Sequence, residues 1–166
     1  CFGVIYKGQS IFNYGDISTC SFHATKVFHT GEGGAMFTNS KELNDKLFYH
    51  HNFGHKGALE FQGLGINAKM SELQAAMGLS ILPYIHTIFT ERKKVVDFYD
   101  RNLDFNKVRK MQLRQGTTWN YSYYPVIFES EVQLLKVEKV LYEHQIIPRR
   151  YFYPSLNKIK YTKGQT

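Results

Sequence analysis

The segment Thr30–Gly34 (TGEGG) constrains the fold of this chain most, because three of its five residues are glycine. Only glycine enters positive φ freely, so the segment predicts a tight turn. β-Branched and aromatic residues dominate residues 16–24, which follow the turn signal NYGD, and a second short apolar run covers residues 35–38. We therefore predict a buried strand, a glycine turn and a second strand, with Lys26 just past the end of the first strand.

Helical patterns dominate the middle of the chain. Residues 39–42 (NSKE) are typical of a capping box, which predicts a helix from there to about His50. Residues 51–66 contain four glycines and little periodicity, which indicates a long loop of the kind that often carries function. A helical stripe predicts a helix over 70–82, and Pro83 is expected to begin a second helix, after a bend, that reaches about Leu103.

The last third of the chain is predicted to form a smaller unit. Residues 104–119 are polar and basic, and we expect them to link two units. Residues 121–128 predict a strand, Ser130 is expected to cap a helix, and residues 146–152 predict a final strand. This order favours α/β structure in the first part and a small α+β unit in the second.

Composition excludes several classes of protein. We expect no membrane span, because no run of about twenty apolar residues occurs, and the N-terminal residues lack signal-peptide architecture, which favours a cytoplasmic protein. Two cysteines outside any metal-ligand spacing predict neither a disulfide scaffold nor a zinc site. His51 and His55 stand four residues apart, but without an HExxH pattern we expect no metal.

The net charge of +7 admits two kinds of partner. Lysine and arginine are spread along the chain and form no single basic block, so a nucleic-acid partner is not favoured. A basic excess also attracts phosphorylated small molecules, and charge alone leaves the choice open.

Two blocks of sequence carry a family resemblance. Residues 21–35 contain SFHATK followed by TGEGGA, and residues 65–76 read GINAKMSELQAA. In order and spacing, with Asn52-Phe53-Gly54 between them, these blocks resemble the signatures of the DegT/DnrJ/EryC1/StrS aminotransferases. The resemblance implies an α/β chain of the PLP-dependent transferase fold type I. It assigns residues 1–103 to part of the large cofactor-binding domain with a connecting helix, and residues 104–166 to part of a small C-terminal domain.

The resemblance also implies site residues. Lys26 corresponds to the lysine that forms the Schiff base with pyridoxal 5′-phosphate (PLP), and Ser21 to a serine that binds the cofactor phosphate. Asn67 corresponds to an asparagine that reaches the phosphate of the neighbouring subunit's cofactor, which implies a homodimer. The alternatives are an exposed lysine, a strand serine bonded to its own backbone and a turn asparagine.

The arginine-rich segment after residue 148 offers a further candidate. Arg150, with Tyr151 and Tyr153, could clamp a substrate phosphate or carboxylate, because guanidinium presents a planar fork of donors. The alternative is an edge strand with solvated arginines.

The expected function is transamination of a nucleotide-linked keto-deoxysugar, dTDP-4-keto-6-deoxyglucose by resemblance, with glutamate as donor, in amino-sugar and surface-polysaccharide biosynthesis. A 3-keto sugar, an inactive remnant and a basic nucleic-acid-binding module stay open. A related dehydratase replaces the lysine by histidine, so Lys26 counts against it.

By resemblance, the acid that protonates the cofactor's pyridine nitrogen and the glycine-threonine phosphate loop precede Cys1, and the usual end of the family lies beyond Thr166, so we expect a fragment.

Overall fold

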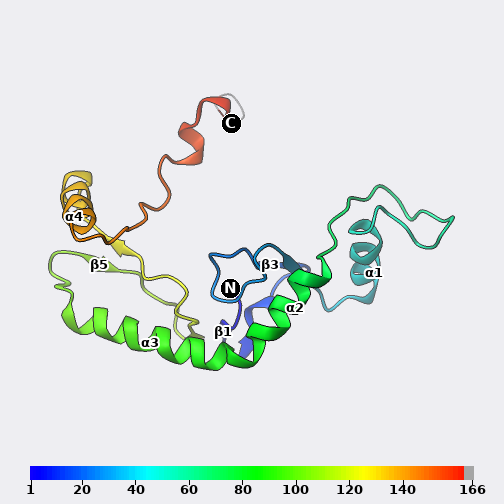
Figure 1. The fold of residues 1–166 in the computed structure, drawn as a ribbon, viewed down its shortest axis with the longest axis horizontal. Helices are drawn as coiled ribbons and strands as arrows, with labels where there is room; N and C mark the ends of the chain where they lie inside the picture. The colour runs from blue at the N-terminus through cyan, green and yellow to red at the C-terminus, as the bar shows by residue number, and fades with distance from the viewer. Residues whose placement is uncertain (163–166) are drawn as a thin grey trace. The chain divides into compact units, whose positions relative to one another are not determined.

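The computed structural model describes residues 1–162, which form two compact units (Figure 1). The first contains Cys1–Leu103 and Met111–Pro125, and the second contains Asp104–Lys110 and the chain from Val126 onward. The chain leaves the first unit after Leu103, returns for residues 111–125 and leaves it again. Each unit is described by itself below.

A small antiparallel sheet forms where the sequence patterns predicted no strand. β1 (Ile5–Tyr6) pairs with β2 (Gln9–Ser10) through a two-residue turn in which Lys7 and Gly8 have φ of 47° and 77°. Positive φ at both turn residues is the geometry that matches the twist of a tight hairpin. β6 (Thr117–Thr118) pairs with the other edge of β1, so the expectation of a plain linker over 104–119 is wrong.

The two strands around the lysine are present, the first shorter than predicted and the second shifted by one residue. β3 (Ser18–Ser21) pairs antiparallel with β4 (Gly34–Phe37), and Ser21 stands opposite Gly34. A Cβ on Gly34 would lie 2.8 Å from the carbonyl oxygen of Cys20, so glycine permits the close pairing. Of the β3 residues only Cys20 is buried, so the strand is buried on one face alone.

The predicted helices of the first unit are confirmed, with adjusted ends. α1 (Lys41–His50) begins after Ser40, whose Oγ accepts a hydrogen bond from the backbone N–H of Leu43. Because Ser40 and not Asn39 is the cap, the NSKE segment closes no capping box. α2 (Glu72–Ile81) is followed by a 3₁₀ turn (Leu82–Tyr84), and α3 (Ile85–Asn102) then runs in a new direction (Figure 1).

Pro83 therefore lies in the 3₁₀ turn and not at the start of α3, which begins two residues later. Proline lacks the N–H that an α-helix interior needs, and the tighter turn accommodates it. No helix within residues 1–162 is long and apolar enough to cross a membrane.

Aromatic packing makes the core of the first unit. Phe22 and Phe28, on either side of Lys26, are both buried and meet edge to face with ring centroids 5.0 Å apart. Phe2 stacks on Phe28 at 4.3 Å, and Cys20 and Ile85 complete the buried cluster. The segment that carries the lysine is thus anchored by an apolar side chain at each end, each of which contributes about 1.5–3 kcal/mol when fully buried.

Up to residue 162, the second unit contains one strand pair and one α-helix. β5 (Arg109–Lys110) pairs antiparallel with β7 (Val126–Ile127), and α4 (Glu131–Glu143) begins after its cap Ser130, as predicted. Two 3₁₀ turns, Leu156–Lys158 and Lys160–Thr162, follow.

Two predicted strands are wrong in whole or in part. Only Val126–Ile127 of the predicted strand 121–128 is extended in a ladder, because Tyr121 has φ of 55° and its carbonyl, with that of Ser122, accepts hydrogen bonds from Arg92. Residues 146–152 form no strand. Their β-branched pattern finds no ladder partner within the described part of the chain, and strand propensity needs such pairing to take effect.

Candidate functional site

Lys26 lies in the turn by which the chain leaves β3. Its backbone N–H donates to the carbonyl of His23 at 2.9 Å, which closes the turn, and its side chain is half-buried. Within residues 1–162 no ion pair and no side-chain hydrogen bond involves its ammonium group. The amine is thus held near the surface by a local turn and is free of a competing carboxylate.

Ser21 is the last residue of β3 and lies at the start of the same turn. Its side-chain oxygen accepts a hydrogen bond from the backbone N–H of His23 at 3.3 Å. Because this bond uses the hydroxyl oxygen as acceptor, the hydroxyl proton stays available to donate to an anion. The structure therefore brings Ser21 and Lys26 together, on the two sides of His23.

His23 is a residue of this turn that the sequence analysis assigned no role. Its Nδ1 lies 2.9 Å from the hydroxyl of Thr25 and accepts the backbone N–H of Thr25 at 3.2 Å. Its Nε2 lies 3.4 Å from Oε1 of Glu32 in the glycine turn. A spacing of nine residues does not indicate this pair, because the two side chains meet only when the chain reverses between them.

The glycine turn takes the predicted conformation and joins the two sequence blocks. Gly31 and Gly33 have φ of 77° and 150°. A Cβ on Gly33 would collide with Thr30 Oγ1 and lie 2.8 Å from Met70 Sδ, so the turn packs directly against the segment that leads into α2. Thr30 is buried and its hydroxyl donates to the carbonyl of Glu32 at 2.7 Å, which fixes the turn from within.

Asn67 lies in the exposed loop before α2. It forms an isolated antiparallel bridge with Asn52, and its Oδ1 accepts a hydrogen bond from Lys69 Nζ at 2.6 Å. The same ammonium lies 4.3 Å from the ring centroid of Phe53. The amide nitrogen of Asn67 is therefore left to donate elsewhere, but no hydrogen bond within the described residues connects Asn67 to the Lys26 turn.

Arg150 and Tyr153 come together in the second unit, while Tyr151 packs elsewhere. An Nη of Arg150 lies 2.7 Å from Oε1 of Glu131 on α4, and the guanidinium carbon lies 3.4 Å from the ring centroid of Tyr153. Tyr151 stacks on Phe152 with centroids 3.9 Å apart. The expected edge strand is absent and Arg150 is ion-paired and stacked, whereas Arg149 is exposed.

The histidines that had suggested a metal have local roles. The rings of His50 and His51 donate from Nδ1 to the carbonyls of Leu64 and Phe48, and the His55 ring contacts Phe61 with centroids 4.7 Å apart. In the part of the chain that the structure describes, no three His, Cys, Asp or Glu side chains gather as metal ligands would.

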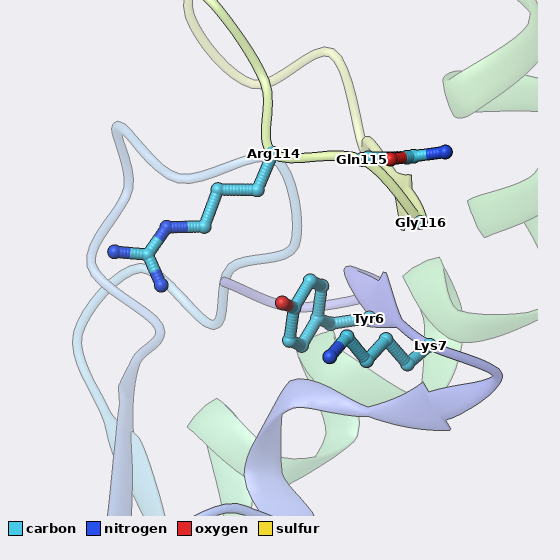
Figure 2. A pocket seen from close by; sticks show the side chains of 5 residues that line it. All are labelled: Tyr6, Lys7, Arg114, Gln115 and Gly116. Carbon is cyan, nitrogen blue, oxygen red and sulfur yellow. The ribbon is translucent and has the colours of Figure 1, made fainter.

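A shallow hollow of about 530 Å³ lies beside the β1–β2 hairpin. Tyr6 and Lys7 line it from the hairpin, and Arg114, Gln115 and Gly116 line it from the segment before β6. Figure 2 shows the polar ends of Arg114, Tyr6 and Lys7 on one side of the hollow, with Gln115 turned away. None of these residues belongs to either sequence block, and the hollow is separate from the Lys26 turn.

The chemistry of the Lys26 turn fits PLP. An aldehyde cofactor needs an amine without a bound carboxylate, and its phosphate needs donors with a free proton. Lys26 supplies the first and Ser21 the second, while the amide nitrogen of Asn67 is a further donor on the loop. Within residues 1–162 the amine of Lys26, the hydroxyl proton of Ser21 and the amide nitrogen of Asn67 are not engaged by internal contacts.

Comparison with known proteins adds an independent observation. The profile of the DegT/DnrJ/EryC1/StrS aminotransferase family matches residues 1–166. The chain is 39% identical over 156 residues to dTDP-4-amino-4,6-dideoxy-D-glucose transaminase from Shigella dysenteriae. The aligned region covers 92% of this chain and 42% of that protein.

Solved structures agree on the fold. DesI, solved in the presence of its TDP-sugar product, superposes with a TM-score of 0.85 at 29% identity, over 99% of this chain and 43% of that one. Spr1654 from Streptococcus pneumoniae in its PMP form gives a TM-score of 0.87 at 22% identity, over 98% and 46%. The α/β aminotransferase fold expected from the sequence is thereby confirmed.

The chain spans less than half the length of these relatives. Within that span the family profile covers every residue, including the glycine turn, the lysine and the loop with Asn67. This chain therefore belongs to the DegT/DnrJ/EryC1/StrS aminotransferase family.

Proposed function

We propose that the protein transfers an amino group from glutamate to a nucleotide-linked keto-deoxysugar, with PLP as cofactor. The observation that carries the proposal is the half-buried Lys26, free of any described ion pair, on one turn with Ser21. Support for the cofactor comes from the family, which is PLP-dependent, and from Spr1654, whose structures include PLP and PMP forms.

The substrate proposal is dTDP-4-keto-6-deoxyglucose. It is supported by the name of the Shigella dysenteriae relative, a transaminase of dTDP-4-amino-4,6-dideoxy-D-glucose, and by the TDP-sugar product of DesI. A 3-keto sugar is the alternative within the same chemistry. Assay of the 3-keto and 4-keto sugars in parallel distinguishes them.

Each site residue has a proposed task. Lys26 holds the cofactor through its amine and, when released, moves a proton between the cofactor carbon and the substrate carbon. PLP supplies the electron sink that makes this carbon acid enough. Ser21 donates to the phosphate of this cofactor and Asn67 to that of the neighbouring subunit's cofactor, and Arg150, Tyr151 and Tyr153 contact the substrate. We assign residues 1–103 to the cofactor-binding domain and residues 104–166 to the small domain, except that residues 111–125 pack with the first compact unit.

A homodimer is the proposed assembly. The loop before α2 and the exposed face of α2 present large apolar side chains to solvent: Leu59 is 92%, Leu64 93% and Leu73 85% exposed. Apolar surface of this extent is typical of an interface. Asn67 lies on the same loop, so a second copy docked there would meet it, as the proposed sharing of phosphate ligands requires.

Borohydride trapping tests the assignment of Lys26. The complete gene product, loaded with PLP and reduced with borohydride, should carry the cofactor on the peptide that contains Lys26. Lys26→Ala should abolish release of 2-oxoglutarate from glutamate in the presence of the keto-sugar. Lys41→Ala is the matched control, because Lys41 is an exposed lysine paired with Asp45 on α1 and should not affect labelling. Labelling of another lysine would reject the assignment.

A further inference from the structure

We propose that His23, held by Glu32, is a positioning residue that fixes the distance between the cofactor-binding amine of Lys26 and the phosphate-binding hydroxyl of Ser21. The inference rests on the proposed function of those two residues. It assigns a role to a residue that stands between them in sequence: its backbone contacts both, and its side chain contacts Thr25 and Glu32.

His23 is the only residue within 1–162 that the hydrogen bonds connect to both ends of this turn. Its N–H donates to Ser21 Oγ at 3.3 Å, and its carbonyl accepts the N–H of Lys26 at 2.9 Å. The main chain of His23 thus contacts the Ser21 hydroxyl directly and holds the backbone from which the Lys26 side chain extends. Whatever fixes the His23 side chain also limits rotation of this main chain.

The ring of His23 is fixed from two directions. Because the N–H of Thr25 points at Nδ1, that nitrogen must accept, so a neutral ring carries its proton on Nε2. Nε2 then donates toward the carboxylate of Glu32, 3.4 Å away. One tautomer satisfies both contacts, so the pair ties the lysine turn to the glycine turn in a single geometry.

The exposure of the His23–Glu32 pair indicates that it contributes to local geometry and little to global stability. The side chains of His23 and Glu32 are 46% and 71% exposed. Ion pairs with this exposure contribute little to global stability. The contribution is therefore local: the pair holds a turn whose two functional groups must meet one ligand at a fixed spacing, where small displacements cost binding.

Three variants of the complete gene product test the proposal. Glu32→Gln weakens the contact to Nε2. His23→Asn loses that contact while its side-chain oxygen can still accept the N–H of Thr25. The double variant reports their coupling. Glu42→Gln is the matched control, because Glu42 is a similarly exposed carboxylate, 76%, in a pair with Lys46 on α1.

The measurements are the dissociation constant for PLP by spectral titration, the inhibition constant of inorganic phosphate against PLP binding, and the melting temperature without cofactor. Each single variant should raise the PLP dissociation constant by roughly two- to fivefold, the effect expected from the loss of one exposed ion pair. The double variant should show little further loss, and the melting temperatures of Glu32→Gln and Glu42→Gln should match that of the wild type.

Unchanged affinity in Glu32→Gln, or additive losses in the double variant, would overturn the role of the pair while leaving Lys26 and PLP in place. A lower melting temperature in the variants that lose PLP affinity would mean that His23 only stabilises the fold. That result would also overturn the proposed positioning role. Failure of the wild-type protein to bind PLP would instead reject the proposed function on which the inference rests.

Discussion

Gly54 and Gly65 approach each other so closely that neither position has room for a side chain. A Cβ on Gly65 would overlap the backbone nitrogen of Gly54, and one on Gly54, whose φ is 76°, would overlap the carbonyl of Gly63. The backbone of Phe53 donates to Ile66 at 3.0 Å across the same crossing. The two glycines therefore close the base of the loop that presents Asn67.

At this scale we predict that Gly65→Ala destabilises the loop. The added methyl group meets backbone, which cannot move aside as a side chain can, so we expect a cost of about 1–3 kcal/mol in the free energy of unfolding. Hydrogen exchange of the Ile66 and Ala68 amides should rise at the same time. Gly57→Ala is the control, because no atom lies within 4 Å of a Cβ there and its φ is not positive. Equal stability of the two variants would contradict the prediction.

The start of α2 shows how one element is fixed next to the site. Ser71 Oγ accepts from the N–H of Gln74 at 3.3 Å, and Gln74 Oε1 accepts from the N–H of Ser71 at 2.8 Å. This is a complete capping box, which satisfies two backbone donors that a helix start leaves free. Because α2 packs through Gly78 against Thr30, the cap also holds the helix against the glycine turn.

The expected effect of Ser71→Ala is a loss of about 1 kcal/mol in the free energy of unfolding, the usual cost of an N-cap serine. Ser80→Ala, on the same helix, should be close to neutral, because its hydroxyl only donates back to the carbonyl of Ala76. Chemical denaturation of both variants measures the difference. A neutral Ser71→Ala would mean that packing alone fixes the start of α2.

For the whole molecule, the proposed dimer predicts that two inactive variants restore activity when they are mixed. If Asn67 completes the phosphate site of the other subunit, a Lys26→Ala and an Asn67→Ala protein should each have low activity. Each hybrid dimer should contain one intact site, and because random mixing makes about half of the dimers hybrid, the mixture should recover about a quarter of wild-type activity. Release of 2-oxoglutarate before and after unfolding and refolding the mixture measures this. No gain on mixing would reject shared sites.

The sequence alone predicted the parts of this protein that short-range physics controls. The cap at Ser130, the helices Lys41–His50 and Glu131–Glu143 and the glycine turn all depend on contacts within a few residues, and each is present. The resemblance also proposed Lys26, Ser21 and Asn67, whose roles stay predictions. The strand predicted at 146–152 is absent because strands depend on long-range contacts: a strand forms only where a partner pairs with it.

Tertiary structure decided what lies between these parts. The pairing of β1 with β6 joins residues more than a hundred positions apart, and no pattern in either segment indicates it. The contact of His23 with Glu32 likewise requires the chain to reverse at the glycines before the two side chains can meet. Periodicity reports which face of an element is apolar, whereas the choice of neighbour depends on the packing of the whole chain.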